Sequence, residues 1–174
     1  MAESLQDNIQ NTATTIKLPP NSQEAEQSVL GGLMLNDQHW FDLVDILQPS
    51  DFYRNQHQLI YQAMIELANQ DEALDAVTVS EKLKSKSILE KAGGIEYLGQ
   101  LAESSTGASN VIAYARIIRE RSVLRQLIGA ANQIADSAFS TEGKDSETLL
   151  EKAEQAIFSI SEREGSADVP MGID

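Results

Sequence analysis

The chain has 174 residues, a net charge of −14 from 13 basic and 27 acidic residues, and no cysteine. This length allows one domain with its own core plus an extension, and the lack of cysteine excludes a disulfide framework and a cysteine-based metal site. Nucleic acid attracts proteins that offer Lys and Arg, so we expect this acidic chain to bind a basic protein surface more readily than DNA. The alternative is that its acidic charge only keeps it soluble.

Residues 1–17 are polar and are predicted to form a disordered tail, because they carry too little apolar surface to offset the entropy of ordering. A globular helical subdomain is predicted over residues 18–106. Asn21 or Ser22 is expected to cap its first helix, in which Glu24 and Glu26 suit the positive end of the helix dipole. The inward face of this helix is predicted to carry Ala25, Val29, Gly32 and Leu33.

Two further helices are predicted before residue 70. One is expected to begin at Asn36 or Asp37 and to stop before Pro49. Its inward side chains would be Trp40, Val44 and Leu47. The other is expected from about Arg54 to Asn69, and its apolar residues recur at helical spacing: Ile60, Ala63, Met64, Leu67 and Ala68.

Short helices are predicted in the next thirty or so residues. Thr78-Val79-Ser80-Glu81 fits a capping box, which predicts the start of a helix that carries Leu83. Gly93 is expected to end the following turn in the left-handed conformation. Residues 94–103 are predicted to be helical, with Ile95, Leu98, Leu101 and Ala102 facing inward. Since no convincing strand pattern occurs, the fold class is predicted to be all-α.

A long antiparallel helical hairpin is predicted over residues 107–163. Its first helix is expected from Ser109 to about Phe139, about 45 Å at 1.5 Å per residue, and its second from a cap at Asp145 or Ser146 to about Arg163. Apolar residues at heptad spacing predict the seam between them. They are Ile117, Leu124, Leu127, Ala131, Ile134 and Ala138 in the first helix, and Leu149, Ala153, Ala156 and Ile160 in the second. Residues 164–174 are expected to begin a linker.

The hairpin carries more apolar residues than its own pairing can bury. Val111, Tyr114 and Ile118 lie to one side of the predicted seam, and Ile128 and Phe139 add to them. An exposed apolar stripe of this kind indicates association with another chain. The alternative is that the stripe packs on the globular subdomain.

Signatures of catalysis are lacking. The only Gly-Lys pair, Gly143-Lys144, does not fit a P-loop, because Ala138 and Asp145 stand where the motif needs Gly and Ser or Thr. The two histidines, His39 and His57, are not spaced as zinc ligands on one helix, and no Gly-x-Ser-x-Gly elbow occurs. No apolar run approaches the roughly 18 residues of a membrane span and no signal peptide is recognisable, so we expect a cytoplasmic protein without membrane contact.

Several segments resemble, in order, the amino-terminal domain of the DnaB family of bacterial replicative helicases. They are residues 18–32, which begin Leu18-Pro19-Pro20-Asn21, then Asp51-Phe52-Tyr53-Arg54, Leu74-Asp75-Ala76-Val77-Thr78-Val79, Gly93-Gly94-Ile95-Glu96-Tyr97-Leu98, Tyr114-Ala115-Arg116-Ile117-Ile118 and Leu149-Leu150-Glu151-Lys152-Ala153. The resemblance covers about residues 18–163. It departs from the family at residues 104–108, where relatives commonly carry a proline.

The resemblance implies an assembly domain without catalysis of its own. In that family the hairpins pair domains into dimers, three dimers form a collar on a hexameric ring, and the collar receives the primase. The ATP and Mg²⁺ sites belong to a carboxy-terminal RecA-type ATPase domain, which this sequence is expected to lack. No cofactor is therefore expected in this chain, and little direct binding of nucleic acid.

Residues for two kinds of contact can be proposed from the sequence and the resemblance. The primase-binding surface is predicted to contain Glu24, Tyr97, Ile128 and Ile134, although Ile134 fits the hairpin seam equally well. Self-association is predicted to use Val111, Tyr114, Ile117, Ile118, Leu124 and Leu127. Two other functions remain open: a free-standing helical adaptor, and a helix-turn-helix-like DNA-binding domain whose recognition helix would offer only Gln100 to the bases.

Overall fold

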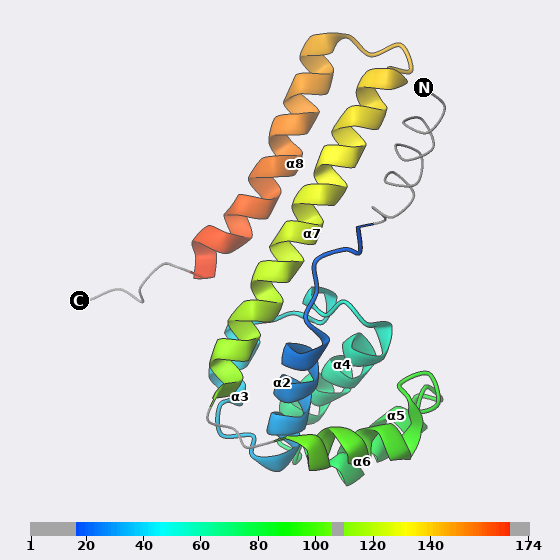
Figure 1. Ribbon diagram of the computed structural model, residues 1–174, viewed down its shortest axis with the longest axis vertical. Helices are drawn as coiled ribbons and strands as arrows, with labels where there is room; N and C mark the ends of the chain where they lie inside the picture. The colour runs from blue at the N-terminus through cyan, green and yellow to red at the C-terminus, as the bar shows by residue number, and fades with distance from the viewer. Residues whose placement is uncertain (1–16, 106–109, 168–174) are drawn as a thin grey trace, which may run out of the picture.

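The computed structural model describes residues 17–105 and 110–167 and, within these, contains helices and no strand. The predicted all-α fold is confirmed. Five helices and one 3-10 turn form a globular subdomain, from which α7 and α8 project as an antiparallel hairpin (Figure 1). The predicted tail, apart from residue 17, and most of the predicted linker lie outside the described residues, as do residues 106–109 before the hairpin. No helix in the described part is long and apolar enough to span a bilayer.

Helix α2 (Gln23–Leu35) lies at the centre of the subdomain and packs against both α6 and α7. Ser22 caps it as predicted, accepting a hydrogen bond from the N–H of Ala25 at 3.2 Å. Its glycine pair allows the close approach of its neighbours. A Cβ atom on Gly31 would lie 2.1 Å from the carbonyl oxygen of Leu101, and one on Gly32 would lie 2.8 Å from a methyl group of Val111.

Helix α3 (Trp40–Ile46) begins three or more residues later than the sequence suggested. The reason is that Asn36 closes α2, with its N–H bonded to the carbonyl of Gly32, while its side chain accepts from the N–H of Gln38. The 3-10 turn η1 (Pro49–Asp51) follows, and then α4 (Asn55–Asn69) with the bounds and buried stripe expected. The Tyr61 hydroxyl of α4 donates to the carbonyl of Leu47 at 2.9 Å and so fixes the end of α3 on the core.

Helices α5 (Ala76–Ser85) and α6 (Gly94–Ser104) cover the far side of the subdomain. The predicted capping box at Thr78 is wrong: Asp75 caps α5 by accepting from the N–H of Thr78, so the helix begins two residues before Thr78. Gly93 adopts the left-handed conformation that was predicted, with φ +106°. Ile95 was expected to face inward but is 65% exposed, because the buried face of α6 runs through Gly94, Leu98 and Leu101.

The hairpin consists of α7 (Val111–Phe139) and α8 (Ser146–Ala167). Helix α8 continues four residues beyond the expected end at Arg163. Its predicted cap at Asp145 is confirmed, since this side chain accepts from the N–H of Thr148 at 2.9 Å. Helix α7 packs on α2 and α3 at its start, and beyond the subdomain it runs antiparallel to α8 (Figure 1).

Candidate partner-binding surface

A buried carboxylate connects both hairpin helices to the globular subdomain. Asp51, at the end of η1, accepts from Arg119 Nη1 at 3.0 Å and from the Ser122 hydroxyl at 2.8 Å, both on α7. Arg163 of α8 donates from both terminal nitrogens, at 2.8 and 2.6 Å. Burial acts to raise the pKa of Asp51, but the bonds from Arg163, the Gln48 N–H and Ser122 outweigh it and lower that pKa. The ionised carboxylate therefore fixes the orientation of the hairpin.

Arg125 of α7 holds the segment that precedes α2. Its guanidinium donates to the carbonyls of Pro20 and Asp51, both at 2.7 Å, and lies 5.3 Å from the centre of the Tyr53 ring. The first turn of α2, with Glu24, is thereby anchored beside the middle of α7. Ile128 lies one turn further along the same helix.

A hydrogen-bonded chain runs from the interior of the subdomain to Tyr97. Glu26 and His57 are buried, and their Oε1 and Nδ1 atoms lie 2.7 Å apart. His57 Nε2 lies 2.5 Å from the Tyr97 hydroxyl, and the two rings are stacked with their centres 6.0 Å apart. Glu26 also accepts from the N–H of Tyr53 at 2.9 Å. With His57 protonated on Nδ1 toward Glu26, the Tyr97 hydroxyl donates to His57 Nε2 and accepts a hydrogen bond from Gln27 Nε2 at 3.5 Å.

The four residues predicted for primase contact differ in accessibility. Glu24 is exposed, Tyr97 is half-buried, and Ile128 is 48% exposed. Ile134 is half-buried in the hairpin, where it lines a hollow together with Leu149. The first three residues are therefore accessible on the described surface, and Ile134 belongs mainly to the seam.

The residues predicted for self-association divide into two groups along α7. Val111 and Ile118 are 2% and 1% exposed, because they pack into the core of their own chain against the globular subdomain. They are not available on the surface, and the alternative that this part of the stripe packs on the subdomain is the correct one. Tyr114 and Ile117 are half-buried against the same core.

The second group, Leu124 and Leu127, lies beyond the subdomain and is partly exposed, at 38% and 42%. The predicted α7 seam is right at Ile134 but wrong at two alanines. Ala130, not Ala131, is buried, and Ala138 is exposed like Ala131. The predicted α8 seam is consistent with the structure, since all four of its members are half-buried: Leu149, Ala153, Ala156 and Ile160.

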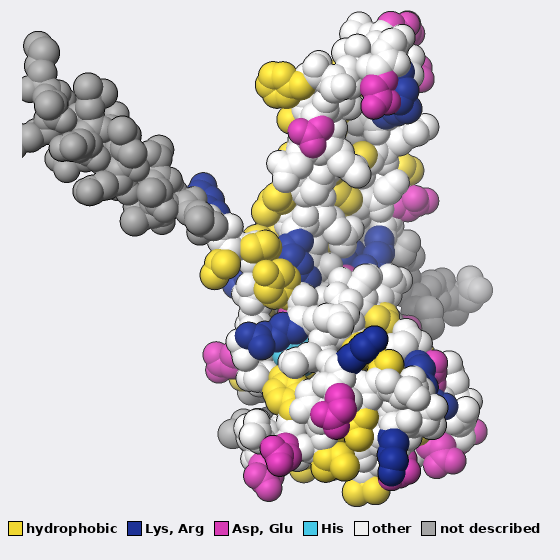
Figure 2. All heavy atoms as spheres, turned by 90° about the vertical axis from the view of Figure 1, so that its right-hand side faces the viewer, with side chains coloured by type: hydrophobic (Ala, Val, Ile, Leu, Met, Phe, Trp, Pro, Cys, Tyr) yellow, Lys and Arg dark blue, Asp and Glu magenta, His cyan; other side chains and the backbone are white. Residues whose placement is uncertain are grey.

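Helix α8 adds exposed apolar residues that the sequence reasoning did not single out. Leu150, Ile157 and Phe158 are 64%, 50% and 64% exposed. Leu150 follows the seam residue Leu149, and Ile157 and Phe158 follow the seam residue Ala156. Their positions next to the seam could have identified them as outward-facing. Figure 2 shows apolar side chains along one edge of the hairpin and near its base, where basic side chains also gather.

The buried ionisable groups of this surface are engaged inside the chain. Asp51 bonds the hairpin arginines, and Glu26 bonds His57. Within the described ranges, no group of three or more His, Asp or Glu side chains is placed to hold a metal ion. These contacts position helices and leave apolar and aromatic side chains at the surface, an arrangement suited to binding another protein.

Comparison with known proteins gives a consistent result. Residues 18–120 match the family described as DnaB-like helicase N terminal domain. The chain is 38% identical over 159 residues to the replicative DNA helicase DnaB of Haemophilus influenzae, a match that covers 91% of this chain and 34% of that helicase. The chain thus spans about a third of the length of such relatives.

Solved structures show the same similarity. The crystal structure of the N-terminal domain of DnaB helicase from Mycobacterium tuberculosis is 36% identical, with a TM-score of 0.79, and the match covers 82% of this chain and 99% of that one. The N-terminal domain of DnaB helicase from Helicobacter pylori, described together with its interactions with primase, is 28% identical. It has a TM-score of 0.56, covering 66% of this chain and 89% of the other.

Proposed function

Since the chain belongs to the DnaB family of replicative DNA helicases and matches its amino-terminal domain, we propose that it assembles the helicase ring and recruits primase to it. In this proposal two hairpins pair, and three such dimers form a collar on a hexameric, ATP-dependent helicase that unwinds DNA at the replication fork. The domain itself performs no bond chemistry. ATP and Mg²⁺ would act in the ATPase domain of the complete helicase.

The observation that carries the assembly role is the apolar surface of the hairpin. Seven large apolar side chains of α7 and α8 remain more than a third exposed: Leu124, Leu127, Ile128, Phe139, Leu150, Ile157 and Phe158. Apolar surface of this extent on two adjacent helices is typical of an association site. A second hairpin offers matching apolar surface, because the same residues face outward on every copy.

The spacing of exposed residues on α7 suits the packing of another helix. Leu124, Leu127, Ala131, Ala135 and Ala138 follow one another at intervals of 3, 4, 4 and 3 residues, and all five are exposed. This heptad interval keeps a stripe on one face of a helix. The small residues at its far end would allow a second hairpin to approach closely.

The primase role is supported by the surface that contains Glu24, Tyr97 and Ile128. Glu24 offers a carboxylate to a basic partner, in keeping with the net charge of −14, and Tyr97 is held in one orientation by His57. The similar domain from Helicobacter pylori is one that interacts with primase. Docking primase on a collar would raise its local concentration at the unwound DNA.

The primase role is tested by titrating the chain with full-length primase of the same organism by isothermal calorimetry. Ile128→Ala should weaken binding by about 2 kcal/mol, the cost of truncating an interface anchor. Ile95→Ala is the matched control, since Ile95 is also an exposed helical isoleucine but lies on α6. Equal affinity of both variants and the wild type would remove Ile128 from the interface, and failure of the wild type to bind would refute primase recruitment.

A further inference from the structure

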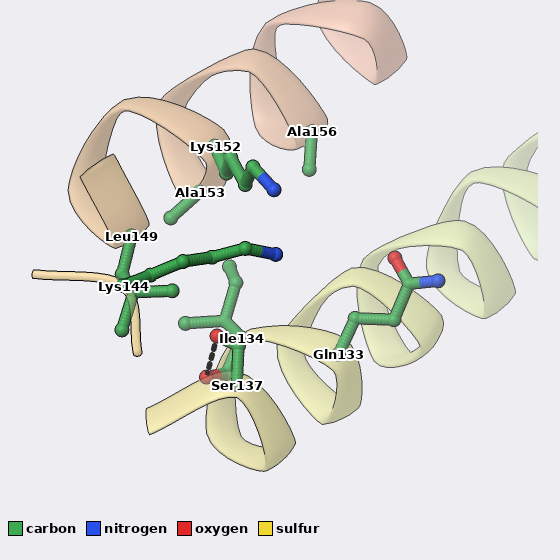
Figure 3. A pocket seen from close by; sticks show the side chains of 8 residues that line it. All are labelled: Gln133, Ile134, Ser137, Lys144, Leu149, Lys152, Ala153 and Ala156. Atoms are coloured by element: carbon green, nitrogen blue, oxygen red, sulfur yellow. Dashed lines mark hydrogen bonds between the residues drawn. The ribbon is translucent and has the colours of Figure 1, made fainter. Parts of the chain in front are cut away.

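A hollow of about 220 Å³ lies between the two hairpin helices near their connecting turn (Figure 3). We call it the hairpin hollow. Its apolar part is formed by Ile134 of α7 with Leu149 and Ala153 of α8. Two lysines also line it, Lys144 from the turn and Lys152 from α8, and the remaining lining residues are Gln133, Ser137 and Ala156. An apolar floor below two ammonium groups suits a protein segment that combines an apolar side chain with a negative charge.

The two lysine side chains run next to each other across the hollow, with their ammonium groups on the same side (Figure 3). The Lys144 side chain lowers the pKa of the Lys152 amine, first by direct contact and then by charge repulsion, while Glu142 opposes this change. Neither lysine forms an ion pair within the described part of the chain, whereas Lys86 pairs with Glu66 at 2.9 Å. Two like charges are thus held together in a chain that is otherwise strongly acidic.

We propose that the hairpin hollow receives a carboxylate-bearing segment of primase, with the carboxylate between Lys144 and Lys152 and an adjacent apolar side chain against Ile134. The assignment rests on the proposed primase function, and it gives Ile134, a seam residue that lines the hollow, an apolar contact with that partner. In this proposal the hollow binds an acidic group of primase, whereas the rest of the surface is suited to basic groups. The carboxylate would relieve the repulsion between the ammonium groups, which the free chain has to tolerate.

A protein segment fits the hollow better than nucleic acid does. The net charge of −14 repels a phosphate backbone at long range, and half of the lining residues are apolar, which a phosphate does not use. Both lysines are exposed to solvent. Exposed interface charges act mainly on the rate of association and on its dependence on salt.

The test compares the wild type with a Lys144→Gln/Lys152→Gln double variant. The control variant is Lys91→Gln, which removes an exposed lysine from the turn before α6. Association with immobilised full-length primase is followed at two salt concentrations, about 50 and 200 mM. The double variant should associate on the order of five- to tenfold more slowly at low salt, and this difference from the wild type should narrow at high salt. The control should behave like the wild type.

A second readout separates binding from structure. The melting temperature of the free double variant should equal or exceed that of the wild type, because the substitution removes a like-charge contact. A melting temperature clearly lower than the wild type would show that the lysines serve the fold, and would overturn the proposal. Unchanged association of the double variant would overturn it too.

Two further outcomes are decisive. If Ile128→Ala weakens primase binding while the double variant binds normally, the proposed function stands, and the proposal that primase occupies the hairpin hollow is wrong. If a 20-nucleotide single-stranded DNA binds the wild type and the double substitution abolishes this binding, the hollow takes a phosphate and the assignment to a protein segment is wrong.

Discussion

Replacing Asp51 with asparagine should destabilise the chain strongly. The side chain is fully buried and accepts four hydrogen bonds from side chains of the hairpin. Asparagine keeps the shape but removes the charge, and it offers an amide donor where the arginines also donate. The guanidinium groups of Arg119 and Arg163 then lose the negative charge of the carboxylate to which they bond.

The magnitude follows from the burial of each partner. Removing one member of a buried ion pair typically costs about 3–5 kcal/mol. The Arg119 side chain is 9% exposed and that of Arg163 is 26% exposed, so water can partly replace the lost partner of Arg163. We therefore expect a loss near the lower limit, about 3 kcal/mol. With a denaturant slope of about 2 kcal/mol per molar, the urea midpoint falls by about 1.5 M.

The assay is urea unfolding at pH 7, followed by circular dichroism at several protein concentrations. Asp45→Asn is the matched control, since Asp45 is exposed on α3, and its free energy of unfolding should change by less than about 0.5 kcal/mol. If Asp51→Asn unfolds within about 0.5 kcal/mol of the control, the carboxylate does not hold the hairpin to the subdomain and the reasoning is wrong.

Three other predictions concern the same interior. The pKa of Asp51 is lowered from its ordinary value of 3.8, so the stability that this carboxylate gives the fold is complete above that value and is lost as the pH falls through the folded-state pKa. The difference in unfolding free energy between wild type and Asp51→Asn should therefore shrink from pH 7 to pH 3. A constant difference would contradict this prediction. Gly31→Ala places a Cβ atom 2.1 Å from a backbone carbonyl of α6 and should cost about 2 kcal/mol or more in urea unfolding, whereas Gly99→Ala meets no atom within 4 Å and should gain about 0.5–1 kcal/mol. Tyr97→Phe leaves His57 Nε2 without its hydroxyl partner and should cost about 1 kcal/mol in the same assay; an unchanged midpoint would show that this hydrogen bond contributes nothing.

Helical periodicity predicted the long elements well, because each buries one continuous stripe. It failed along α7, where one helix meets two different neighbours. Val111, Ala115 and Ile118 face the subdomain, and Ile134 faces α8. A single heptad register drawn through both halves therefore shifts away from the true seam, and it treats buried residues as an exposed stripe.

The contacts that position the surface could not be predicted from local patterns. Asp51 meets Arg119 and Arg163 across 68 and 112 positions of sequence, and nothing in the spacing of these residues indicates the pairing. The same holds for Glu26 and His57, on different helices. Ser22 was a correct cap and Thr78 an incorrect one, because Asp75 competes successfully for the N–H of Thr78.

Light scattering on the purified chain over a range from micromolar to millimolar concentration tests the assembly claim most directly. The hairpin surface predicts a dimer or larger species at high concentration. An Ile157→Asp/Phe158→Asp variant, altered only at exposed positions of α8, should remain a monomer with an unchanged helical circular dichroism spectrum. A wild type that stays monomeric at millimolar concentration would contradict the proposal that these hairpins pair.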